Sequence, residues 1–136
     1  MPDLGSTEMT MLWASLLLGL IYLVAADVAN VAKRGLGWAL GARDEAAADA
    51  GPLAGRLERA WKNYLETLPI FVGAVLVEAS AGHGSGLGPL GAQLYFWARV
   101  IYLPAYATAV PYVRTVSWLV SIAGIVLLLL ACVPGL

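Results

Sequence analysis

Four apolar stretches in this chain are each long enough to cross a lipid bilayer as a helix. They cover about 9–34, 57–79, 87–109 and 113–133, and roughly 20 mainly apolar residues are needed to span about 30 Å of hydrocarbon. The composition agrees, because 60% of the 136 residues are hydrophobic and 12% are charged, whereas soluble domains carry roughly 25% charged residues. We therefore expect a single domain over 1–136, an all-α integral membrane protein built as a four-transmembrane-helix bundle with up-down topology.

The basic residues lie mainly at one end of the predicted bundle. Arg114 borders the third connection, whereas the N-terminus, the Gly-rich connection 80–90 and the C-terminus carry no basic residue. The residues that border the first connection are Lys33, Arg34, Arg43, Arg56, Arg59 and Lys62. The first segment follows Asp3 and Glu8 without a basic residue, so we interpret it as a retained helix, not as a cleaved signal peptide. Because basic residues concentrate in cytoplasmic connections, we expect the first and third connections in the cytoplasm and both termini outside it.

Charge and cysteine content argue against several classes of function. A net charge of −1 without a concentrated basic face argues against a nucleic-acid partner. The single cysteine, Cys132, excludes an internal disulfide and a cysteine-built metal site. The only histidine, His83, lies in the Gly-rich connection. We therefore expect no metal site.

Polar residues inside the predicted helices recur at helical spacing. The sets are Arg56, Arg59, Asn63 and Glu66 in the second helix, Arg99, Tyr102 and Tyr106 in the third, and Asp27, Asn30 and Arg34 in the first. Residues three and four apart share one face of an α-helix. An ionisable residue inside a membrane helix costs roughly 2.5–3.5 kcal/mol on insertion scales. We therefore expect three polar stripes turned away from lipid, with partners or a water-filled cavity beside them.

These stripes allow a structural and a functional interpretation. In the structural one, Glu66 pairs with Arg99 and the tyrosines donate to the backbone, so the stripes only hold the bundle together. In the functional one, they line an anion-binding site that opens toward the cytoplasm. The charges of that half favour the second interpretation: the cations are Arg59, Lys62, Arg99 and Arg114, and the acids are Glu66 and at most Asp27. An arginine fork can grip a carboxylate with two parallel hydrogen bonds.

Two sequence blocks place these polar residues in a recognisable context. The first is RAWKNYLE over 59–66, followed by Pro69. The second is ARVIYLPAY over 98–106, followed by PYVRT over 111–115. In this order and at this separation the blocks resemble the motifs of the MAPEG family, the membrane-associated proteins in eicosanoid and glutathione metabolism. The segment GARD over 41–44 is similar to the first connection of bacterial members, so the resemblance covers essentially the whole chain.

The resemblance implies a ligand, an assembly and a chemistry. It implies homotrimers of four-helix subunits, with glutathione as co-substrate bound between neighbouring subunits near the cytoplasmic face. The matching glutathione contacts are Arg34, Arg59, Asn63, Glu66, Arg99, Tyr102 and Tyr106. For the first helix, Lys33 and Asn30 are alternatives to Arg34. Arg114 matches the catalytic arginine that activates the glutathione thiol.

We accordingly expect a glutathione S-transferase or glutathione-dependent peroxidase that acts on lipophilic electrophiles. Its partners would be membrane lipid and a hydrophobic small-molecule substrate, and its location the bacterial inner membrane. One alternative is a scaffold or ligand-binding protein that keeps the fold without catalysis. Another is a small multidrug-type transporter, for which Asp27 would supply the membrane acid. The strong bias of the basic residues and the cation-rich stripes fit a transporter of cationic drugs less well.

Overall fold

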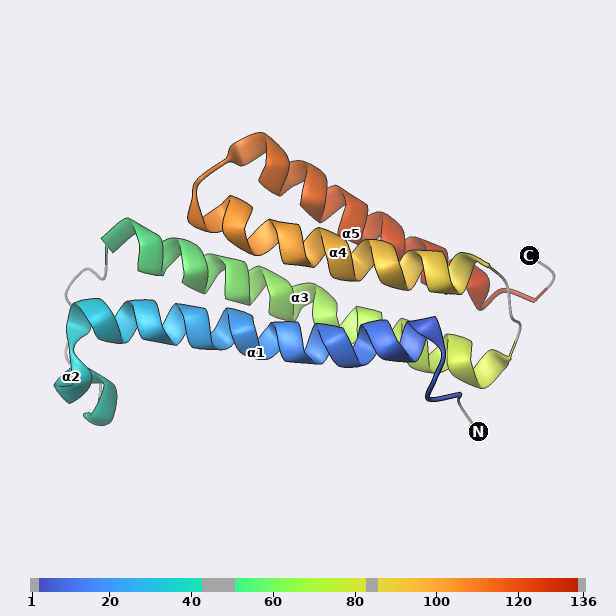
Figure 1. Ribbon diagram of the computed structural model, residues 1–136, viewed down its shortest axis with the longest axis horizontal. Coiled ribbons are helices and arrows are strands. Elements are labelled where there is room, and N and C mark those ends of the chain that lie inside the picture. Colours follow the sequence, from blue (N-terminus) through green and yellow to red (C-terminus); the bar gives the residue numbers. More distant parts are fainter. Residues whose placement is uncertain (1–2, 43–50, 83–85, 135–136) are drawn as a thin grey trace.

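The computed structural model is all-helical over the residues that it describes, which are 3–42, 51–82 and 86–134. The helices are α1 (Thr7–Arg34), α2 (Leu36–Leu40), α3 (Gly51–Ala81), α4 (Leu87–Ala107) and α5 (Pro111–Ala131). The long helices α1, α3, α4 and α5 lie side by side, whereas α2 turns away from the end of α1 (Figure 1). The predicted all-α class is confirmed for this part of the chain.

Three of the long helices have both the length and the composition of membrane spans. They are α1, α3 and α5. The helix α4 has 21 residues, about 31 Å at 1.5 Å per residue, but Gln93 and Arg99 interrupt its apolar sequence, and it is not among these three. The membrane character of the chain is thus supported by three helices, and the fourth crossing stays a prediction.

The observed helix boundaries have local causes. The Ser6 hydroxyl caps α1 by accepting a hydrogen bond from the backbone N–H of Met9 at 3.3 Å. Gly35, at φ +86°, ends α1 in a conformation that glycine adopts without strain. Pro111 occupies the first turn of α5, where its missing N–H costs nothing.

The first connection was predicted incorrectly in part. This connection joins the predicted helices 9–34 and 57–79, but Leu36–Leu40 forms α2 and α3 already begins at Gly51. A five-residue helix presents too few residues to show a helical period. Residues 43–50, which include Arg43, lie outside the described part.

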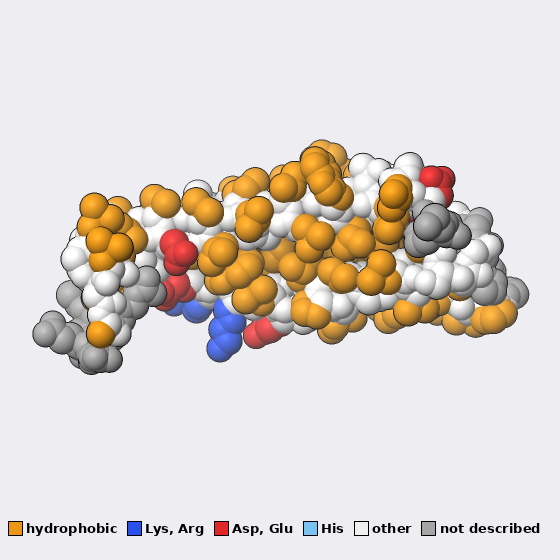
Figure 2. Space-filling view, turned by 90° about the horizontal axis from the view of Figure 1, so that it is seen from below, with side chains coloured by type: hydrophobic (Ala, Val, Ile, Leu, Met, Phe, Trp, Pro, Cys, Tyr) orange, Lys and Arg blue, Asp and Glu red, His pale blue; other side chains and the backbone are white. Residues whose placement is uncertain are grey.

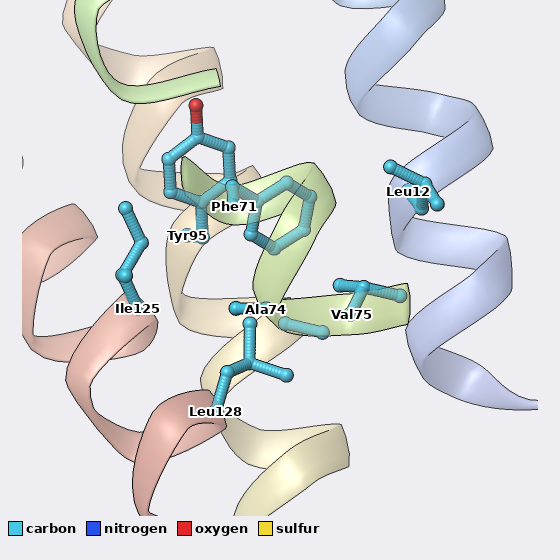
Figure 3. Packing of buried hydrophobic residues seen from close by; sticks show 8 residues of the cluster. Leu12, Phe71, Ala74, Val75, Tyr95, Ile125 and Leu128 are labelled. Atoms are coloured by element: carbon cyan, nitrogen blue, oxygen red, sulfur yellow. The ribbon is translucent and has the colours of Figure 1, made fainter. Parts of the chain in front are cut away.

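Close packing joins α4 to α5. A Cβ atom built on Gly91 would lie 2.5 Å from the carbonyl oxygen of Gly124, and one on Gly124 would lie 2.6 Å from the carbonyl oxygen of Gly91. Small residues allow two helix backbones to approach in this way. Next to this crossing, buried side chains from all four long helices meet, with the rings of Phe71 and Tyr95 stacked at 4.0 Å (Figure 3).

One face of the molecule is mainly apolar in its middle and carries its visible basic side chains toward one end (Figure 2). Seen from below, hydrophobic side chains cover the middle of the molecule, and the basic side chains visible on this face gather toward the end that carries α2 (Figure 2). Large apolar side chains such as Leu20 and Val28 are more than half exposed. This pattern suits lipid around the middle and water or headgroups at the charged end.

Candidate anion-binding site

A polar cavity of about 300 Å³ lies between α3, α4 and α5. It is lined by Asn63, Tyr102, Tyr106, Arg114, Thr115 and Trp118. The tight turn between α4 and α5 sets its position, because it brings the C-terminal turns of α4 beside the first turns of α5. The lining contains one cation and no carboxylate, so the cavity favours an anionic ligand.

Arg114 is held over the aromatic wall of the cavity. Its guanidinium carbon lies 5.0 Å from the centre of the Tyr106 ring, a distance at which a cation is attracted to the ring face. The Tyr102 and Tyr106 rings are 5.5 Å apart. Arg114 is half-buried, so its charge is less screened than on an open surface.

Arg99 lies behind the cavity and is completely buried. It donates from Nη1 to the Asn63 side-chain oxygen and from Nη2 to the Thr67 hydroxyl, each at 2.8 Å. The ring of Tyr102 lies 5.0 Å from its guanidinium carbon. In the described part of the chain no carboxylate forms an ion pair with Arg99. Burying an unpaired charge is costly, so this arginine favours a nearby anion.

The structural interpretation of the stripes is wrong for Arg99, and the two tyrosines that do donate to the backbone, Tyr22 and Tyr64, are not stripe residues. Tyr22 donates its hydroxyl to the backbone oxygen of Arg99, and Tyr64 donates to that of Ser15, each at 2.6 Å. The expected ion pair between Glu66 and Arg99 is not formed. Instead, Asn63 stands between them, because its amide nitrogen donates to Glu66 at 3.3 Å while its oxygen accepts from Arg99.

The predicted site residues are partly brought together in one chain. Four of them line the cavity, namely Asn63, Tyr102, Tyr106 and Arg114. Arg99 and Glu66 reach it through Asn63. Arg59 is exposed one turn before Asn63 on the same stripe of α3.

Arg34 lies apart from the cavity in a single chain. Its guanidinium carbon stacks 4.6 Å above the Trp38 ring of α2. Among the described helices, α1 has no contact with α5, and α2 contacts α1 alone. Arg34 therefore does not meet Arg114 within one subunit.

Two residues of the network were not singled out from the sequence. Thr67 binds Arg99, and Tyr95 shares a hydrogen bond with Thr67 at 3.2 Å. Thr67 follows Asn63 by four positions and Tyr95 precedes Arg99 by four. Helical spacing alone could thus have placed both on the polar stripes.

Metal ligands do not cluster in the part of the chain that the structure describes. No three His, Cys, Asp or Glu side chains there are grouped so that they could hold a metal ion. His83 falls in 83–85, outside the described residues.

The model of a known protein family matches this chain. The model of the MAPEG family matches residues 10–134, which is nearly the whole chain. No curated protein sequence matches this chain significantly. The family match and the membrane-span helices agree with the motifs in α3, α4 and α5, and the chain belongs to the MAPEG family.

Proposed function

We propose that this protein binds glutathione in the cavity between α3, α4 and α5 and transfers it to lipophilic electrophiles. One observation carries the proposal: two arginines, one buried behind the cavity and one in its wall, lack a carboxylate partner in the described part of the chain. Glutathione carries two carboxylates, and its thiol becomes an anion on activation. Both features suit a site with uncompensated positive charge.

The side chains around the cavity offer mainly donors to such a ligand. Arg114 supplies a charged fork, and Tyr102 and Tyr106 supply hydroxyl groups. The amide nitrogen of Asn63 is a further donor, because its oxygen is already bound to Arg99. The Glu66 carboxylate, beside Asn63, would receive the glutathione amino group. Arg59 would bind a carboxylate at the open end of the same stripe.

Arg114 is the proposed catalytic residue. A free thiol with a pKa of about 8.5 is mostly protonated at neutral pH, and only the thiolate is a good nucleophile. Lowering the pKa by about two units requires roughly 2.7 kcal/mol of differential stabilisation. A half-buried guanidinium close to the sulfur can supply this amount, because the effective dielectric constant is well below that of water.

The second substrate would enter from the bilayer. Apolar side chains such as Val116 and Leu119 of α5 are more than half exposed near the cavity-lining residues Thr115 and Trp118. The thiolate would attack an electrophilic carbon to form a thioether, either displacing a leaving group such as halide as an anion or adding to an activated double bond, whose other carbon then takes a proton from water. With a lipid hydroperoxide, two glutathione molecules would instead be oxidised to their disulfide while the peroxide is reduced to an alcohol and water.

The fourth membrane crossing belongs to the same proposal. The polar side chains Tyr95, Arg99 and Tyr102 of α4 are buried inside the subunit, whereas its exposed side chains include Trp97 and Ile101. Lipid would therefore contact an apolar surface although the helix also carries these polar side chains. With α4 as a span, both termini lie on one side of the membrane, and the basic first connection places them outside the cytoplasm of a bacterial inner membrane.

Glutathione titration by calorimetry tests the proposal. We expect saturable binding to the purified wild-type protein in detergent, and at least tenfold weaker binding to the Arg114→Leu variant. Lys62→Met is a matched control, because it removes an exposed basic residue of α3 that does not line the cavity. Absence of heat at millimolar glutathione, with a folded wild-type protein, would leave a non-catalytic scaffold as the better account.

A further inference from the structure

The orientation of the Asn63 amide decides what the cavity offers to a ligand. A guanidinium has only N–H donors, so the atom of Asn63 that faces Arg99 must be its oxygen. The 2.8 Å contact from Arg99 Nη1 to that oxygen agrees. The amide nitrogen is then left on the side of Glu66 and the cavity. Arg99 thereby makes Asn63 a donor toward the ligand.

Arg99 needs a second support to hold this position. It is completely buried, and the Asn63 oxygen is the partner of one arm of its fork. The other arm donates to the Thr67 hydroxyl at 2.8 Å. Thr67 is also buried, so no water replaces this partner if the hydroxyl is removed, and a buried donor without an acceptor is destabilising.

The donor and acceptor capacity of the Thr67 hydroxyl fixes the direction of each hydrogen bond that it forms. A hydroxyl has one proton and two acceptor positions. The Thr67 hydroxyl donates to the backbone oxygen of Tyr64 at 3.3 Å. It must then accept from both Arg99 Nη2 at 2.8 Å and the Tyr95 hydroxyl at 3.2 Å. These three bonds use the whole capacity of Thr67.

Tyr95 is fixed by packing, so it can hold Thr67 in turn. It is completely buried, and its ring is stacked on Phe71 at 4.0 Å within the apolar cluster (Figure 3). Its hydroxyl is shared with Thr67. The rigid core is thus connected through Tyr95, Thr67 and Arg99 to Asn63 at the cavity wall.

We propose that Thr67 and Tyr95 are positioning residues that hold Arg99 so that the Asn63 amide nitrogen points into the cavity and binds a carboxylate of glutathione. The inference rests on the proposed glutathione site for its ligand. The hydrogen-bond arrangement in the free protein does not depend on that ligand.

Three variants separate an effect on the orientation of the Asn63 amide from an effect on the stability of the protein. Thr67→Val keeps the shape but removes the hydroxyl, and we expect about tenfold weaker glutathione binding in calorimetry, the effect of losing roughly 1.4 kcal/mol. Thr67→Ser restores the hydroxyl and should bind within about twofold of wild type. Asn63→Asp keeps an acceptor for Arg99 and gains an ion pair with it, but it replaces the bond to Glu66 by a contact between two carboxylates. The ion pair with the buried Arg99 outweighs repulsion from the exposed Glu66, so the variant should unfold no more easily than wild type. It should nevertheless lose glutathione binding, because a carboxylate oxygen then faces the ligand.

A ligand-free measurement distinguishes failure of this inference from failure of the proposed function. The chain contains only two asparagines, Asn30 and Asn63, so selective nitrogen-15 labelling gives two side-chain amide signals. We expect Thr67→Val and Tyr95→Phe to shift the Asn63 signal and leave the Asn30 signal in place, whether or not glutathione binds. An unchanged Asn63 signal in both variants would overturn the inference. A shifted signal in a protein that does not bind glutathione would refute the ligand and keep the positioning network.

Discussion

Replacing Arg99 by methionine should separate the stability of this protein from its ligand binding. Methionine is unbranched and fills the space of the arginine stem, but it removes the charge and both bonds to Asn63 and Thr67. Two hydrogen bonds from a charged donor contribute about 1.5–3 kcal/mol each. Burying the unpaired guanidinium costs several kcal/mol in the opposite direction. We therefore expect the free energy of unfolding to change by less than about 2 kcal/mol.

Glutathione binding should respond very differently to the same change. Without the buried cation, Asn63 loses its fixed orientation and the cavity loses about half of its uncompensated positive charge. We expect at least about hundredfold weaker binding, which corresponds to about 2.7 kcal/mol. Unfolding in mixed detergent micelles gives the stability and calorimetry gives the affinity, with Lys62→Met as the charge control. Loss of more than about 4 kcal/mol of stability with unchanged binding would refute the reasoning, because Arg99 would then only hold the bundle together.

Further predictions concern the crossing of α4 and α5 and the catalytic arginine. Gly91→Ala should destabilise the protein by at least about 2 kcal/mol, because its Cβ would lie 2.5 Å from the Gly124 carbonyl oxygen. Gly73→Ala, where nothing lies within 4 Å of the new Cβ, should instead be neutral or stabilising by up to about 1 kcal/mol. Thermal unfolding of the two variants compares their melting temperatures, and equal melting temperatures would contradict this prediction. Arg114→Leu should raise the pKa of the thiol of bound glutathione by about two units. The measurement is a pH titration of the thiolate absorbance at near-saturating glutathione, in which the variant should lose thiolate signal at neutral pH. An unshifted titration would assign the activation of the thiol to another group.

The sequence predicts which side chains share a polar helix face better than it predicts which residues those side chains contact on the neighbouring helix. Spacing placed Asn63 and Arg99 on polar stripes of α3 and α4, and the structure brings the two side chains together. Spacing cannot say that Arg99 points inward to Thr67 instead of across to Glu66, because that choice depends on how the helices are rotated against each other. The close approach at Gly91 and Gly124 contributes to that rotation. The hydrogen-bond partner of a stripe residue can therefore be identified only from the structure.

The family resemblance implies that glutathione lies between neighbouring subunits, and this position can be tested through Arg34. In one chain Arg34 stacks on Trp38, and its helix does not contact α5. If Arg34 contributes to the site that contains Arg114, the two residues must come from different subunits. An Arg34→Leu chain and an Arg114→Leu chain should then each bind weakly alone but form some intact sites when expressed together. Random mixing in equal amounts would restore about a quarter of the sites in a symmetric ring. Calorimetry on the co-purified assembly measures this fraction, with the two proteins mixed only after purification as the control. Absence of any recovery in an assembly that contains both chains would place Arg34 outside the site, because residues from separate subunits must complement each other.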